Sequence, residues 1–108
     1  MAIKLPRIIG KYVDSSNQHA VKSILACFSD TAIVHDEGRT HNGKAAIEDW
    51  VVKTIGKYKF QFSPLAVEDA EADVAVSMEV SGTFDGSPVI LEYHFAIEND
   101  KILGLKIE

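Results

Sequence analysis

The sequence predicts an α+β domain in which three helices pack on one face of a mainly antiparallel sheet. Apolar residues recur at helical spacing in the first half of the chain, and after Gly56 they recur at every second position. Turn residues separate the later runs, which is typical of strands joined by hairpins. The chain has 108 residues, 46% of them hydrophobic, so we expect one domain over residues 1–108 with its own core.

Three apolar stripes predict the three helices. The first stripe consists of Leu5, Ile8, Ile9, Tyr12 and Val13. Pro6 suits the first turn of that helix, where a missing N–H has no cost. The segment DSSNQ then breaks the pattern, and we expect Ser16 or Asn17 to cap a second helix. The second stripe consists of Val21, Ile24, Leu25 and Phe28. The third predicts a helix from about Gly43 to Ile55 that turns Ile47 and Trp50 inward.

Alternation of apolar and polar residues predicts the strands. Thr31 to His35 reads as a short strand, and a longer one follows in which Tyr58, Phe60 and Phe62 alternate with Lys59 and Gln61. Pro64 interrupts this longer run, which indicates a bulge or an edge strand. Two further runs, joined by the hairpin signal Asp85-Gly86, place on their apolar faces Val74, Val76, Met78, Val80, Val89, Leu91, Tyr93, Phe95 and Ile97. A last strand is expected from Ile102 to Ile107.

Composition excludes several classes of function. The net charge is −5 and the basic residues form no cluster, which argues against a nucleic-acid partner. Cys27 is the only cysteine, so no disulfide can form within the chain. The start of the chain lacks the apolar core of a signal peptide, and no uncharged apolar stretch approaches the length of about 18 residues that spans a membrane. We therefore expect a cytoplasmic protein with no membrane partner.

The segment TAIVHDEGRTHNGKAAIEDW, residues 31–50, carries the candidate chemistry. In a regular strand Asp36 points to the same side as Ala32 and Val34, and His35 points to the other side. We expect the apolar side to face the core and Asp36 to face a cavity, although a bulge would present His35 instead. Arg39 and His41 are expected in a solvated rim. The spacing of His35, Asp36 and His41 matches no strong ligand pattern, so we expect no metal.

Three segments together resemble one known superfamily: GKYVDSSNQHAVKSILACFSDTAIVHDEG, HNGKAAIEDW and ILEYHFAIENDKI. They make the chain similar to the NTF2-like superfamily, and in particular to its SnoaL-like and ketosteroid isomerase-like members. The resemblance implies a cone-shaped, cystatin-like fold with a hydrophobic pocket, three helices before the long strands, and no cofactor. Because unrelated functions share this fold, it does not imply one activity.

The resemblance also suggests catalytic residues. Asp36 falls where the ketosteroid isomerases have their proton-transferring carboxylate, and Tyr12 falls where they have the tyrosine of the oxyanion hole. Tyr93 precedes HF where that family has a protonated aspartate, so the chain departs from the family at this position. The residues alone leave other roles open: a solvated Asp36, a Tyr12 hydroxyl bonded to the backbone, and a Tyr93 that only packs in the core.

The pocket walls and the partners are expected as follows. Because the core of such a fold is partly hollow, core side chains can line the site. The candidate substrate-binding residues are His35, Trp50, Phe28, Phe60, Met78 and Phe95. The expected function is a cofactor-free isomerase or lyase that abstracts a proton from a small hydrophobic carbonyl compound. The alternative is a non-catalytic ligand-binding or dimerisation module. No helix is left to cover the outer face of the sheet, and the residues alone fit a solvated face equally well. Small domains of the superfamily that the chain resembles often pair sheet to sheet, so the resemblance implies a homodimer through that face.

Overall fold

The computed structural model describes residues 4–70 and 73–108. Three helices and six strands follow the chain in the order α1 (Arg7–Asn17), α2 (Val21–Ala26), β1 (Phe28–Asp36), β2 (Arg39–Asn42), α3 (Gly43–Tyr58), β3 (Gln61–Ala70), β4 (Asp73–Ser81), β5 (Val89–Glu98) and β6 (Lys101–Ile107). This order confirms the predicted α+β class, with all three helices ahead of the four long strands.

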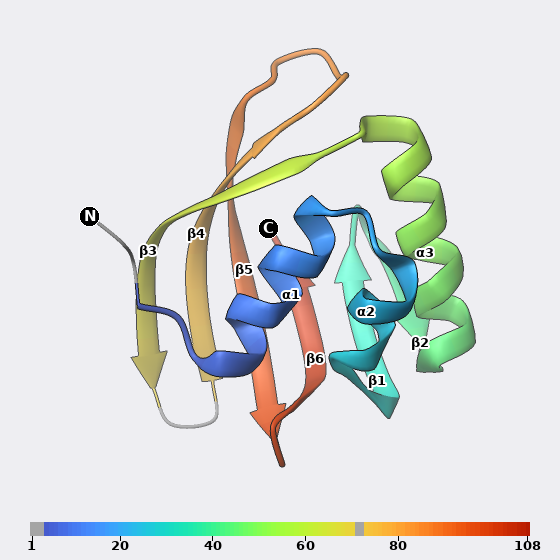
Figure 1. Cartoon of the computed structure of the whole chain (residues 1–108), viewed down its shortest axis with the longest axis vertical. Coiled ribbons are helices and arrows are strands. Elements are labelled where there is room, and N and C mark those ends of the chain that lie inside the picture. Colours follow the sequence, from blue (N-terminus) through green and yellow to red (C-terminus); the bar gives the residue numbers. More distant parts are fainter. Residues whose placement is uncertain (1–3, 71–72) are drawn as a thin grey trace.

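The six strands form one sheet in the order β2-β1-β6-β5-β4-β3. Strands β1 and β6 run parallel, and every other neighbouring pair is antiparallel. The helices lie on one face of the sheet, with α1 crossing the middle strands and α3 lying beside β1 and β2 (Figure 1). None of the helices in the described residues covers the other face. This arrangement places the core, and any cavity within it, between the helices and the inner face of the sheet.

Strict alternation decides which side chains enter the core. Along β4 every second residue is buried, from Val74 to Val80, and the residues between them are half-buried. Helix α1 buries Ile9 and Tyr12 on the facing side, and α3 buries Ile47 and Trp50. The helical and strand stripes therefore meet in one continuous cluster, as expected for a single domain.

The predicted boundary between the first two helices is wrong. Helix α1 continues through the DSSN segment to Asn17, and α2 begins after Ala20 without a side-chain cap. The polar residues find partners in the tertiary structure instead. The Asn17 side chain donates from Nδ2 to the carbonyl oxygen of Phe62 (3.0 Å) and accepts at Oδ1 from the N–H of Phe62 (2.6 Å). Asn17 thus fixes the end of α1 to β3 rather than opening α2.

Strand β2, formed by Arg39 to Asn42, was not predicted from the sequence. Glu37 and Gly38 adopt φ angles of 53° and 74°, and Asp36 pairs with Arg39 across them. Positive φ at both central residues is the requirement of a type I′ turn, the tight turn that suits twisted hairpins. Strand β1 also begins earlier than expected, so that Phe28 belongs to it rather than to the second helix.

Other boundaries follow the sequence more closely. Helix α3 extends to Tyr58, one turn past the predicted end, so the prediction that Tyr58 belongs to the following strand is wrong. The helix stops where Lys59 takes a left-handed conformation with φ of 48°. Strand β3 lies at the edge of the sheet, and its pairing with β4 shifts register between Pro64 and Ala66. The sequence predicted either a bulge or an edge strand at Pro64, and the structure has both features. The turn at Asp85-Gly86 joins β4 to β5, also as predicted.

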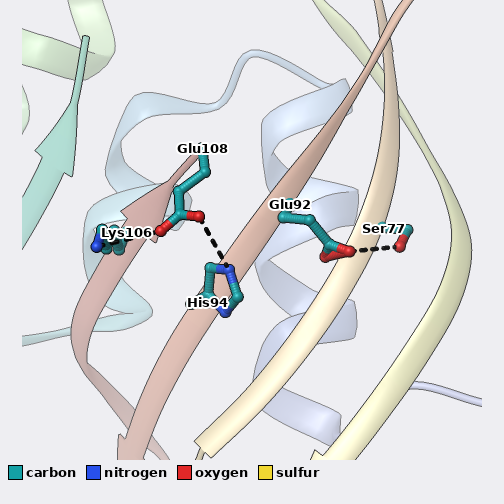
Figure 2. Close-up of polar contacts among 5 residues, drawn as sticks. All are labelled: Ser77, Glu92, His94, Lys106 and Glu108. Atoms are coloured by element: carbon teal, nitrogen blue, oxygen red, sulfur yellow. Dashed lines mark hydrogen bonds and ion pairs between the residues drawn. The ribbon is translucent and has the colours of Figure 1, made fainter. Parts of the chain in front are cut away.

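The outer face of the sheet combines charged groups with exposed aliphatic side chains. Lys106 Nζ lies 3.1 Å from Glu108 Oε1, and the ring of His94 lies 3.9 Å from the other carboxylate oxygen (Figure 2). On the neighbouring strand the Ser77 hydroxyl donates to Glu92 (3.0 Å). Ile33, Ile90 and Leu103 are 37%, 63% and 36% exposed on the same face. This composition differs from the inner face, where the large side chains are buried.

Candidate functional site

A cavity of about 510 Å³ opens between the helices and the inner face of the sheet. Its lining combines residues of all three helices with residues of the sheet and of the β4–β5 loop. The lining residues are Tyr12, Ser16, Ile24, Asp36, Glu37, Gly38, Trp50, Val51, Thr54, Tyr58, Phe60, Phe62, Val80, Phe84, Val89, Leu91, Tyr93, Ile107 and Glu108. The walls are mostly apolar with a few polar groups, which is the usual composition of a small-molecule site.

Asp36 reaches this cavity from the last position of β1. Ala32 and Val34, which share its side of the strand, are fully buried, whereas His35 faces the opposite side of the sheet. The carboxyl group of Asp36 is partly withdrawn from water, and this desolvation raises its pKa above the ordinary value. The neighbouring Glu37 carboxylate adds to the rise, and the Trp50 N–H opposes it by stabilising the ionised form. A raised pKa brings a carboxylate closer to the working range of a general base.

Trp50 fixes the orientation of this carboxylate. Its indole Nε1 donates a hydrogen bond of 3.0 Å to Oδ2 of Asp36, and Trp50 is 8% exposed. The His41 ring of β2 lies against the indole, with the two ring centres 5.9 Å apart and the planes at 32°. Helix α3 and the β1–β2 hairpin therefore hold Asp36 from two sides.

Tyr12 brings a buried hydroxyl to the cavity from helix α1. Its ring packs edge-on against Phe28 (5.8 Å between centres) and Phe95 (5.6 Å), and the residue is 2% exposed. Burial raises the pKa of the Tyr12 phenol well above its ordinary value; the Ser16 hydroxyl partly offsets this and the Asp36 charge adds to it. Tyr12 is therefore a neutral hydrogen-bond donor at physiological pH.

Tyr93 provides a second phenol from strand β5. It is 4% exposed, and its ring lies 5.5 Å from Phe62 and 6.2 Å from Phe95. Burial raises the pKa of Tyr93 well above the ordinary value, and the proximity of Tyr12 and of the Asp36 charge raises it further. Both phenols have Phe62 and Phe95 as neighbours, and the charge of Asp36 raises the pKa of both. One carboxylate and two neutral phenols thus occupy the same apolar cavity.

The rim of the cavity is built where the end of α3 meets the two hairpin turns. The Tyr58 hydroxyl donates to Glu37 Oε1 (2.6 Å), and the ring of Phe84 packs edge-on against Tyr58 at 5.6 Å. The N–H of Thr83 donates to the Tyr58 carbonyl (2.7 Å). A side chain at Gly82 would overlap the same carbonyl, so this close approach requires glycine.

Several predicted binding residues do not line the cavity. Phe28, Met78 and Phe95 are at most 1% exposed and lie in the solid part of the core, where they support Tyr12 and Tyr93. His35 lies on the outer face and contacts the Thr40 hydroxyl (3.2 Å). The pairing of β1 shifts register between Phe28 and Ile33 but is regular from Ile33 to Asp36, so no bulge turns His35 inward. Among the other candidates, Asp36, Tyr12, Tyr93, Trp50 and Phe60 do line it.

Several residues of the site were not predicted from the sequence. Phe62 stacks on Phe60 (4.6 Å between centres, 10° between planes) and lies in the wall; the Phe-x-Phe spacing could have indicated it. Glu37 and Gly38 form the rim because they are the turn of the unrecognised hairpin. Tyr58 and Phe84 carry no sequence signal, because their contact depends on how the β4–β5 loop meets the end of α3.

Within residues 4–70 and 73–108, no three or more His, Cys, Asp or Glu side chains gather as a metal site would need. Of the helices in those ranges, none has the length and apolarity to cross a membrane.

Comparison with known proteins identifies the family. A model of the SnoaL-like domain matches residues 9–104, which is most of the chain. This chain belongs to the SnoaL-like domain family. A search of curated proteins found no match.

Solved structures agree with this assignment. The SnoaL-like chain is 34% identical to a candidate polyketide cyclase, protein SMa1630 of Sinorhizobium meliloti, with a TM-score of 0.93 over 96% of this chain and 95% of that one. A hypothetical protein of Catenulispora acidiphila with a ketosteroid isomerase-like fold, in complex with trimethylamine, is 14% identical (TM-score 0.85; 97% and 86% covered). A computationally designed 17-OHP binder is 12% identical (TM-score 0.80; 94% and 86% covered). The last two likenesses show the fold alone.

Proposed function

We propose that this SnoaL-like protein is a cofactor-free isomerase or lyase that abstracts a proton next to the carbonyl group of a small hydrophobic substrate. One observation supports the proposal most strongly. The partly buried carboxylate of Asp36, whose pKa is raised, shares an apolar cavity with the neutral phenols of Tyr12 and Tyr93. The charge of Asp36 contributes to the raised pKa of both phenols. This is the arrangement that enolate chemistry needs, because a base and an oxyanion site must act on adjacent atoms.

The proposed reaction assigns one role to each group. Asp36 accepts the proton from the carbon next to the carbonyl, and the electron pair of that C–H bond moves to form an enolate. Tyr12 and Tyr93 donate hydrogen bonds to the enolate oxygen, and Asp36 then returns the proton to a different atom. Trp50 keeps the Asp36 carboxylate oriented through the bond to Oδ2. The change in the charge of Asp36 supports these roles. When Asp36 accepts the proton it becomes neutral, so it no longer repels the negative charge of the enolate oxygen beside the phenols.

The similarity to a candidate polyketide cyclase supports the same class of chemistry. Ring closure by an aldol reaction also begins with proton abstraction next to a carbonyl, so the same base and donors could serve isomerisation, elimination or cyclisation. The aromatic wall formed by Phe60, Phe62 and Trp50 favours a planar or ring-containing substrate.

Proton exchange tests the proposal without knowledge of the natural substrate or product. 2-Tetralone, a neutral aromatic ketone, is incubated with the protein in D2O, and loss of the signal of its C1 protons is followed by ¹H NMR. We expect exchange above the buffer rate, reduced about 10²–10⁴-fold in Asp36→Asn, and unchanged in Glu48→Gln, which removes an exposed charge from α3. Equal exchange by the wild type and Asp36→Asn would refute Asp36 as the base.

A second candidate is a non-catalytic ligand-binding module. The designed 17-OHP binder and the trimethylamine complex show that related folds bind small molecules as such. Here the cavity would bind a hydrophobic ligand through the same phenols without turnover. Binding of 2-tetralone with no exchange above the buffer rate would favour this candidate over the enzyme.

We also propose that two copies pair through the outer sheet face. Exposed Ile33, Ile90 and Leu103 supply apolar contact area there, and the face carries both charge signs on Glu92 and Lys106. A two-fold axis would bring identical patches together, so that each cation can meet an anion of the other copy.

A further inference from the structure

All charged groups that line the cavity have the same sign. The acidic side chains that face it are Asp36 and Glu37, and none of the lining residues is Lys, Arg or His. Glu108 also borders the cavity, but its carboxylate lies on the outer face of the sheet, where it pairs with Lys106. When one sign of charge lines a hollow with apolar walls, the walls focus the field and raise the local concentration of the opposite charge. The cavity therefore has a negative potential that the overall charge of −5 reinforces.

The neighbouring basic groups do not neutralise this charge at the centre of the cavity. Lys106 lies on the outer face of the sheet, where it pairs with Glu108 at 3.1 Å. Lys57 is exposed and lies 5.0 Å from the centre of the Tyr58 ring. The ion pairs found among residues 4–70 and 73–108 do not include Asp36 or Glu37. His41, beside Trp50, is the basic side chain whose charge reaches Asp36, and it lies outside the lining.

The walls suit a cation as well as a neutral ligand. The rings of Tyr12, Phe62 and Tyr93 surround the polar end of the cavity, and Trp50 contacts the carboxylate directly. Aromatic faces attract ammonium groups, most strongly where water is excluded, and a carboxylate within the same cage adds to that attraction. An aryl ammonium ion could place its charge by Asp36 and its ring against Phe60 and Phe62.

An anionic ligand is repelled by the charge of the cavity. The two phenols and the indole can donate hydrogen bonds to it, but they lie beside the negative charge of Asp36. An enolate formed during turnover avoids this repulsion, since Asp36 becomes neutral in the step that creates it. A ligand that arrives already ionised, such as a carboxylate or a phosphate, leaves two negative charges in the cavity. Repulsion of this kind is an effective source of specificity.

We infer that the cavity selects ligands by charge, binding apolar cations most tightly, neutral molecules less tightly and anions least. The physiological ligand then lacks carboxylate and phosphate groups, which excludes acids and phosphate-tethered substrates. This selectivity deepens the proposed function by naming the substrate class. It concerns binding alone, so it can hold even where no turnover occurs.

Three probes of similar shape test the order. They are (2-naphthylmethyl)trimethylammonium, 2-naphthylmethanol and 2-naphthoate, and their dissociation constants are measured by NMR titration at pH 7.5 and low salt. We expect the cation to bind about 10-fold or more tighter than the alcohol, and the anion to bind at least about 10-fold weaker than the alcohol. Naphthoate binding as tight as that of the cation would overturn the inference, and so would the absence of binding by all three probes.

Two variants test whether the charge of Asp36 causes the preference for cations. Asp36→Asn should reduce the preference for the cation over the alcohol about 10-fold and strengthen naphthoate binding, while leaving the alcohol within about 3-fold. Glu48→Gln removes an equal charge from the exposed face of α3 and should leave the order unchanged. An equal loss of preference in both variants would show that only net charge matters and would overturn the role of the cavity. If the order holds but 2-tetralone exchange fails, the catalytic proposal alone is refuted.

Discussion

The indole Nε1 of Trp50 donates a 3.0 Å hydrogen bond to Oδ2 of Asp36 and so links helix α3 to the end of strand β1. This bond has two consequences. It gives the buried indole N–H the partner it needs, and it stabilises the ionised form of a carboxylate whose pKa burial raises. The properties of Asp36 therefore depend on a residue 14 positions away in the sequence.

Replacing Trp50 with Phe should raise the pKa of Asp36 further, because the ionised carboxylate loses its donor. The loss of this bond and of packing volume should lower the free energy of unfolding by about 1–3 kcal/mol. A titration of the carboxyl ¹³C resonance of Asp36 measures the first effect, and urea unfolding measures the second. In Glu48→Gln, on the same helix, the Asp36 titration should not move. An unchanged pKa in Trp50→Phe would show that the bond is not formed in solution.

The raised pKa of Asp36 predicts how stability depends on pH. Because the folded-state pKa lies above the unfolded value, near 3.8, ionisation of Asp36 opposes folding. Wild-type stability should fall as pH rises from that value through the folded-state pKa. An asparagine cannot ionise, so the Asp36→Asn variant should not lose stability in this pH range and should be more stable than the wild type at pH 7. The difference should be at most about 1 kcal/mol, because the Asp36 carboxyl is partly exposed to water. Thermal unfolding of both proteins between pH 3 and 8 checks this. A less stable Asp36→Asn at pH 7 would contradict it.

Removal of the hydroxyl of either Tyr12 or Tyr93 should weaken the binding of a molecule that mimics an enol. 2-Naphthol should bind with its hydroxyl near Tyr12 and Tyr93, and we expect Tyr12→Phe and Tyr93→Phe each to weaken it about 10-fold, the value of one good hydrogen bond. Tyr58→Phe is the matched control, since that hydroxyl bonds to Glu37 at the rim. Chemical-shift titration gives all four constants. If Tyr58→Phe has the largest effect, the polar end of the cavity is not where the ligand oxygen binds.

The outer sheet face can be tested for self-association. Ile90→Arg should convert a dimer to a monomer in sedimentation velocity, because it places a charge among the exposed aliphatic side chains of that face. Val52→Arg changes a residue that is 51% exposed on α3, across the sheet, and should leave the assembly intact. A wild-type protein that sediments as a monomer at 100 µM would refute pairing through this face.

Asn17 should matter more than its surface position near a helix end suggests. Asn17→Ala leaves the N–H and the carbonyl of Phe62 without their partners at 2.6 and 3.0 Å. We expect a loss of about 2 kcal/mol in the free energy of unfolding, from two bonds of about 1 kcal/mol each. Asn42→Ala, at a helix start where the side chain makes no capping bond, should cost less than about 0.5 kcal/mol. Equal losses in the two variants would show that the Asn17 link to β3 adds nothing.

Local pattern determined much of the architecture without the structure. The change from helical to alternating spacing after Gly56 identified the order of helices and long strands, since each periodicity records which side of an element meets the core. Proline at position 64 indicated the irregular edge strand because it cannot donate to a ladder. The alternation through Ala32 and Val34 also predicted which way Asp36 points, and the regular pairing of β1 from Ile33 to Asp36 maintains that direction.

Tertiary contacts decided the rest. Asn17 pairs with the backbone of a strand 45 residues away, so its helix continues where local propensity predicts a cap. Phe28, Met78 and Phe95 have the same apolar character as the wall residues, and only the packing of the helices determines which apolar side chains border empty space. The rim pair Tyr58 and Glu37 depends on a turn meeting a helix end. Sequence patterns report which side of an element is buried, whereas a cavity is defined by what fails to fill the space between elements.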